Sequence, residues 1–124
     1  MIRLIRTSTL LLLAAVLTTA AGAAPKTEVV TVRKSHQVAA PIGLNIRSKP
    51  SSKGRWLGSL EEGKKLQLAG GAALRPGFAT VHLTQDGEDP TAYWAPIQAP
   101  VAGYVLYRAL NGDGSSYFYV TPSR

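Results

Sequence analysis

Apolar and polar residues alternate in short runs from Val38 to Tyr107, and each run ends at glycine, proline or serine. Alternation with a period of two places successive side chains on opposite faces of a strand, and the interruptions are typical turn residues. No apolar pattern in this region keeps a helical period long enough to predict a helix. The pattern predicts five short strands, at 44–47, 56–60, 65–68, 78–83 and 103–107.

Five short strands within about 65 residues predict an all-β domain with a small curled sheet or barrel, which limits exposed strand edges. The polar stretch 24–37 contains three valines and is interpreted either as a linker or as a first edge strand. At the other end, a glycine-rich turn precedes the aromatic run 117–120. Aromatic residues favour strands, so 111–124 is interpreted as a tail with a possible extra strand, against the start of the chain or against a partner.

The segment 84–102 does not follow the pattern of short turns, because it holds three prolines. We interpret it as a long inserted loop, a feature that is usually functional or disordered. Tyr93 and Trp94 lie between two of the prolines and argue against plain disorder. Two roles for Trp94 remain open at this point: it folds back to cover the core, or it faces a ligand.

The N-terminus has the three parts of an export signal. Arg3 and Arg6 precede an apolar run at 10–17, and Ala21 and Ala23 then occupy the two small positions of a cleavage site. The run is about half the length that a membrane-spanning helix needs. Residues 1–23 are therefore predicted to be a cleaved signal peptide, and the product is expected in the periplasm or outside the cell, without a membrane span.

Cysteine is absent from the chain, which excludes disulfides and the acylated cysteine of a lipoprotein. The chain carries 14 basic and 7 acidic residues, a net charge of +7, and loss of Arg3 and Arg6 with the signal leaves +5. This excess favours anionic partners such as wall polymers or lipid headgroups, or it simply gives a basic solvated surface. Export makes nucleic acid the least suitable partner.

No constellation of residues in the sequence predicts catalysis, a metal or a cofactor. The two histidines are far apart: His36 near the start, and His82 in a predicted strand, where its position indicates the outer face or a place beneath the long loop. With no cysteine beside them, their spacing does not match a metal site. The carboxylates at 61–62 and 86–89 fall in a turn and a loop, where solvated side chains are expected. The sequence predicts a protein that is not an enzyme.

Five segments in order carry a resemblance to a known family: LNIRSKP at 44–50, GSL at 58–60, EEG at 61–63, FATV at 78–81 and GYV at 103–105. The first resembles the L-N-[VI]-R-S-x-P opening of the bacterial SH3-like domain family, and the next two match the family's G-x-L strand end and charged turn. The last two are similar to its W-x-x-V and G-W-V segments, with phenylalanine and tyrosine in place of tryptophan.

The resemblance covers 38–110 and implies an SH3-like barrel of about five short strands, here with the enlarged loop 84–102 before the last strand. It also implies a ligand that is a cell-wall component or a peptide, because such domains are often attached to wall hydrolases. The family usually has a tight hairpin where this chain has its long segment.

A basic loop surrounds Pro50 and is the strongest candidate for binding. No acidic residue lies among its cations, Arg47, Lys49, Lys53 and Arg55. In an SH3-like barrel this loop borders a groove with an aromatic floor, for which the candidates are Trp56, Tyr93, Trp94 and Tyr104. Arginine can bind a carboxylate through two hydrogen bonds, which suits the free carboxylates of a peptidoglycan stem peptide. The alternative is a solvated positive loop.

Together these observations predict an exported, monomeric, non-catalytic binding module that recognises peptidoglycan or a peptide. A protein-interaction factor, such as an inhibitor or immunity protein for an exported enzyme, is the alternative. The two hypotheses differ in the partner: the first expects the cell wall, and the second expects another exported protein.

Overall fold

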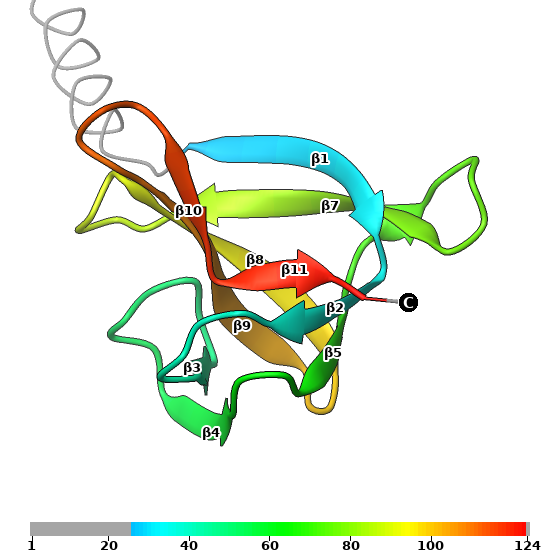
Figure 1. Ribbon diagram of the computed structural model, residues 1–124, viewed down its shortest axis with the longest axis horizontal. Coiled ribbons are helices and arrows are strands. Elements are labelled where there is room, and N and C mark those ends of the chain that lie inside the picture. Colours follow the sequence, from blue (N-terminus) through cyan, green and yellow to red (C-terminus); the bar gives the residue numbers. More distant parts are fainter. Residues whose placement is uncertain (1–25, 124) are drawn as a thin grey trace, which may run out of the picture.

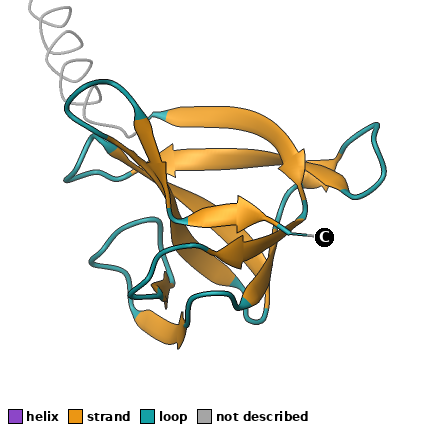
Figure 2. Cartoon of the chain, in the orientation of Figure 1, coloured by secondary structure: helices purple, strands orange, loops and turns teal. Residues whose placement is uncertain are grey.

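The computed structural model describes residues 26–123, which form an all-β fold without a helix (Figure 2). The predicted signal peptide 1–23 and its cleavage site lie outside the described residues. Within the described part, no helix is long and apolar enough to cross a membrane.

The described chain forms eleven strands, and the five predicted from alternation are all present, as β3, β4, β5, β7 and β9. The strands are β1 (Thr27–Arg33), β2 (Ser35–Val38), β3 (Leu44–Arg47), β4 (Trp56–Leu60), β5 (Lys65–Leu68), β6 (Gly71–Ala72), β7 (Phe78–Gln85), β8 (Ala92–Ala99), β9 (Gly103–Leu110), β10 (Ser116–Phe118) and β11 (Val120–Pro122).

All pairings are antiparallel, and the strands form one open sheet whose main order is β11-β2-β5-β8-β9-β3-β4 (Figure 1). β7 pairs with β8 and carries β1 and β6 on its other side, while β10 pairs with β9. The middle of the sheet is therefore β8 and β9, which pair from Ala92 with Ala109 to Ile97 with Gly103.

The prediction of a long loop at 84–102 is wrong, because residues 92–99 form the central strand β8. β8 pairs with β7 at Tyr93 and Trp94 and with β5 at Ile97 and Ala99. Pro96 lies between these two pairings, where β8 changes neighbour and a proline is tolerated. The proline content that suggested a loop instead marks this change of partner.

Both ends of the described chain take part in the sheet. β1 pairs only with β7, as an edge strand, so residues 27–33 form a strand and not a linker. β2 lies between β5 and β11, with His36 and Val38 fully buried. The tail forms β10 and β11, and the predicted pairing of a tail strand with the start of the chain is confirmed by the β11–β2 ladder (Figure 1).

The main core is built from alternate residues of the strands, as a pleated sheet dictates. Its fully buried members include Val81 and Leu83 on β7, Ala95 and Ile97 on β8, and Val105 on β9. Complete burial of such side chains stabilises the fold by about 1.5–3 kcal/mol each. This layer fixes the position of β8 and β9, on which the site described below is built.

Gly103 begins β9 at a point where β3 passes too close for a side chain. A Cβ atom there would lie 2.7 Å from Ile46 Cγ2 and 2.9 Å from the Arg47 carbonyl oxygen. We expect Gly103→Ala to lower the free energy of unfolding by about 2 kcal/mol through overpacking, measured by urea denaturation. Gly112→Ala is the control, because a Cβ at Gly112 meets nothing within 4 Å; equal losses from the two variants would contradict this account.

Candidate functional site

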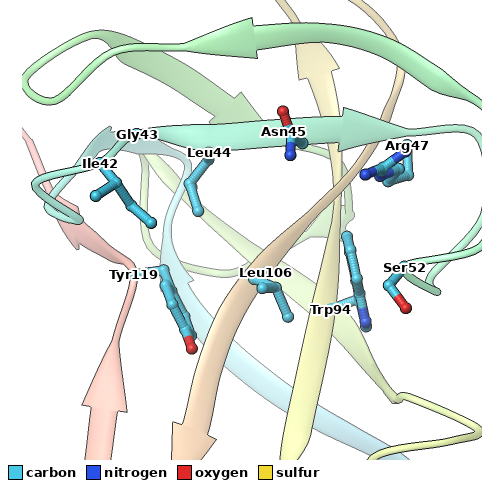
Figure 3. A pocket seen from close by; sticks show the side chains of 9 residues that line it. All are labelled: Ile42, Gly43, Leu44, Asn45, Arg47, Ser52, Trp94, Leu106 and Tyr119. Atoms are coloured by element: carbon cyan, nitrogen blue, oxygen red, sulfur yellow. The ribbon is translucent and has the colours of Figure 1, made fainter.

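A groove with a volume of about 200 Å³ runs between β3, β8, β9 and the C-terminal segment (Figure 3). Its lining is mostly apolar, and Arg47 and Ser52 form a polar and cationic end. The lining residues are Ile42, Gly43, Leu44, Asn45, Arg47, Ser52, Trp94, Leu106 and Tyr119.

The floor of the groove is the face of β8 and β9 that points away from the main core. Trp94 is the register partner of Leu106, whereas Ala95 is paired with Val105, so the first pair lies on the opposite face from the second. In Figure 3, Leu106 lies between the rings of Trp94 and Tyr119. Two aromatic rings therefore flank one aliphatic side chain.

Ile42 and Tyr119 give the groove its open end. Ile42 is 97% exposed at the mouth, although it belongs to a tight turn closed by a hydrogen bond from Gly43 N to the Ala40 carbonyl. Tyr119 is half-buried, and burial raises the pKa of its phenol, with smaller contributions from Tyr117 and Asp89. The Tyr119 hydroxyl therefore stays protonated at neutral pH and can donate a hydrogen bond.

Trp94 is buried, with 3% of its surface exposed, and it is held by a buried carboxylate. Its Nε1 donates to Asp86 Oδ2 at 2.8 Å. The backbone N–H groups of Glu88 and Asp89 donate to Asp86 Oδ1 at 2.8 and 3.2 Å. The sequence left two roles open for Trp94, packing or contact with a ligand. Its burial and its hydrogen bond to Asp86 indicate packing, although part of the side chain also lines the groove.

Asp86 was expected to be solvated, and that expectation is wrong: it is 5% exposed. Burial by itself raises the pKa of this carboxyl. The hydrogen bonds from its three donors, together with the Ser52 backbone, outweigh burial and hold the pKa below its usual value. Asp86 thus stays ionised and supports the wall of the groove.

The basic loop 48–55 at the cationic end is closed by its own hydrogen bonds. Ser48 N donates to the Arg55 carbonyl at 2.9 Å, and Arg55 N donates to Ser48 Oγ at 2.9 Å. Arg47 Nη1 donates to the Gly54 carbonyl at 3.3 Å. A Cβ at Gly54 would lie 2.9 Å from Lys49 N, so the compact turn requires glycine there. The loop is ordered before any ligand arrives.

The four predicted cations differ in their surroundings. Arg47 is half-buried and lines the groove, while Lys49 and Arg55 are exposed. Lys53 Nζ lies 3.1 Å from Glu88 Oε1, which is the one salt bridge that the loop cations make among residues 26–123. Arg47 is therefore the one cation of the loop that lines the groove, and Lys49 and Arg55 are exposed on the loop beside it.

No family model, curated protein or solved structure matches this chain. The interpretation of the groove therefore depends on its own geometry.

The remaining predicted aromatic residues do not form the floor of the groove. Trp56 is 57% exposed and donates from Nε1 to Asn45 Oδ1 at 3.1 Å, on the outer face of the β3–β4 pair. Tyr104 is half-buried as the register partner of Arg47. Tyr93 lies 4.5 Å beneath the Arg108 guanidinium, away from the basic loop.

Sequence reasoning did not include Leu44, Leu106 or Tyr119 among the candidate binding residues. Alternation along β9 contained part of the signal, because it separates Leu106 from the buried Val105. The exposed Ile42 between Pro41 and Gly43 was a second signal, since an isoleucine in a turn has no core to join.

The two histidines and the carboxylates were the remaining candidates for a metal site. Among residues 26–123, no group of three His, Asp or Glu side chains could hold a metal ion. His82 is exposed on the outer face of β7, the first of the two places that the sequence left open, whereas His36 is buried in β2.

Proposed function

We propose that this chain is an exported SH3-like domain that binds cell-wall peptidoglycan or an extended peptide in its apolar groove, without catalysis. The observation that supports this most directly is the combination of one aromatic, aliphatic groove with an ordered cationic loop at its end. A ligand with an apolar side chain and a nearby carboxylate would match both parts.

Two structural features favour the SH3-like interpretation. The resembling segments at 44–50 and 58–60 fall on the hairpin of β3 and β4 and on the loop that joins them. The C-terminal segment pairs with β9 through β10 and with β2 through β11. Because β2, β5, β8 and β9 are successive neighbours, this segment connects the two ends of that series. We infer a small barrel from this connection.

The size of the groove argues for an extended chain over an enclosed small molecule. Pockets for small molecules usually measure about 300–1,000 Å³, and this groove has about 200 Å³. It can take one or two side chains of a longer ligand. The carboxylate of such a ligand would lie at Arg47, where bidentate hydrogen bonding is possible, and its apolar part would lie on Leu106.

The proposal predicts retention on purified sacculi at about 50 mM salt, where a cationic protein binds best. We expect Leu106→Ser and Arg47→Gln each to reduce retention about fivefold, because each removes one recognition contact worth about 1 kcal/mol. Arg75→Gln is the matched control: it removes the same charge from an exposed residue in the turn before β7, on another part of the molecule. Absence of wild-type retention, or an equal loss in the control, would contradict the proposal.

Exposure of Ile42 at the mouth of the groove favours a second candidate, recognition of another exported protein. Ile42 extends the apolar surface of the groove beyond Leu106 and Tyr119, and a continuous exposed apolar surface is typical of a protein contact. An inhibitor or immunity factor would co-purify from the periplasm with a stoichiometric partner, and Ile42→Ser would release that partner without loss of retention on sacculi.

A further inference from the structure

The turn 73–77 between β6 and β7 presents an apolar tip on the opposite side of the molecule from the groove. Leu74 is completely exposed there, and its neighbours Ala73, Pro76 and Gly77 are also uncharged. Figure 1 shows this turn projecting from the right-hand end of β7, whereas β3 and the basic loop lie at the left. Nothing in the fold covers the leucine.

Cations surround this tip, and no acid neutralises them. Arg75 and Arg33 place their Cζ atoms 4.5 and 5.4 Å from the centre of the same Phe78 ring. Lys34 is the next residue on the chain, and its N–H donates to the Gly77 carbonyl at 2.8 Å. Within residues 26–123 none of these three cations forms a salt bridge. Like charges held this close favour a bound anion.

We propose that the surface formed by Leu74, Arg75, Arg33, Lys34 and Phe78 docks on a bilayer of anionic phospholipids. An apolar tip within a cationic collar matches the membrane interface, where Leu74 would enter the acyl boundary and the three cations would bind headgroup phosphates. Arginine and lysine side chains reach such a boundary while their charged groups stay in water. A soluble polyanion would bind the cations but would gain nothing from the leucine.

The location of this surface is compatible with the groove but does not depend on it. In Figure 1 the turn 73–77 projects away from β3 and the loop that follows it, which border the groove, so a bilayer at the tip leaves that side of the fold accessible. The β1–β7 ladder, paired from Thr27 with Thr84 to Arg33 with Phe78, connects the tip rigidly to the sheet. Docking and groove binding can therefore be tested separately.

The test is co-sedimentation with vesicles of phosphatidylglycerol and phosphatidylethanolamine, compared with vesicles of phosphatidylcholine. Binding to the anionic vesicles at about 50 mM salt is expected, with a strong reduction at about 500 mM. Arg75→Gln should lower the partition coefficient about fivefold, since one cation near an anionic surface contributes that much. Leu74→Ser should lower it about tenfold through loss of the inserted side chain.

Lys64→Gln is the matched control, because it removes one exposed charge from the turn between β4 and β5, outside both the tip and the groove. Its vesicle binding should stay within twofold of the wild type. The proposal is overturned by absence of binding to anionic vesicles, by an equal loss in the control, or by full binding of Leu74→Ser. Glycerophosphate distinguishes a free phosphate ligand from a bilayer. If this anion displaces the protein and Leu74→Ser has no effect, the patch binds phosphate groups and not a bilayer.

Discussion

Asp86→Ala is expected to lower the free energy of unfolding by about 3 kcal/mol, because it leaves a buried indole N–H and two backbone N–H groups without an acceptor. Trp94 Nε1 is the buried member of this set, at 2.8 Å from Asp86 Oδ2. The loss would appear as a lower urea midpoint. A loosened Trp94 should also change the intrinsic fluorescence before global unfolding.

Asp113 provides the control for this prediction. It accepts hydrogen bonds from Ser115 N at 2.9 Å and from Ser115 Oγ at 2.6 Å, but it is fully exposed in a turn. Asp113→Ala should change the melting temperature far less than Asp86→Ala, because water replaces the lost acceptor. If the two variants unfold alike, burial of the Asp86 network is not what stabilises the groove wall.

The low pKa of Asp86 gives the same network a pH signature with a definite sign. The folded state holds this carboxyl ionised below the pKa of about 3.9 that an unfolded aspartate has. Its stabilisation is complete above that value and is lost as the pH falls through the folded pKa. Asp86→Asn should flatten the acid limb of the stability profile.

The strand pattern of this fold was predictable because it is local. Alternation in LNIR and KLQL places Leu44 and Leu66 on buried faces, and the structure has both as strands. β8 was not predictable in the same way, since its three surrounding prolines are turn signals. Only the pairing of β8 with both β7 and β5 explains Pro96, and pairing between distant segments is not encoded in a local pattern.

The same difference between local and long-range patterns separates the site residues that were predicted from those that were missed. The basic loop was found because Arg47 and Lys49 are close in sequence, and one turn brings them together. Much of the apolar lining was missed because Leu44, Leu106 and Tyr119 come from three distant segments that meet only when the sheet forms. The burial of His36 was predictable, since alternation places its side chain on the same face as that of Val38, which is buried.

His36→Leu is expected to stabilise the protein by about 2 kcal/mol near pH 7, because it removes two buried polar atoms that make no well-aligned hydrogen bond within residues 26–123. The imidazole is fully buried beside Tyr107, with ring centres 5.8 Å apart. Among residues 26–123, neither Nδ1 nor Nε2 has a well-aligned hydrogen-bond partner, although backbone groups of Arg33 and Ser35 lie near enough to favour the protonated ring. Burial lowers the pKa of His36, and the nearby backbone of Arg33 and Ser35 opposes only part of that shift.

The same substitution should remove a slope that the wild-type stability shows as the pH falls below about 6.5. The unfolded chain binds a proton on this histidine near pH 6.5, whereas the folded chain resists it until a lower pH. Stability is therefore complete above pH 6.5 and falls as the pH drops towards the folded pKa, so the gain from His36→Leu grows on acidification.

His82 is the other histidine, and its side chain is exposed on β7, so His82→Gln should keep the wild-type slope. A slope that persists in His36→Leu and disappears in His82→Gln would show that the buried imidazole is not the group that titrates. If the slope follows His36, the domain is weakest in acid because one core position of β2 holds a buried imidazole.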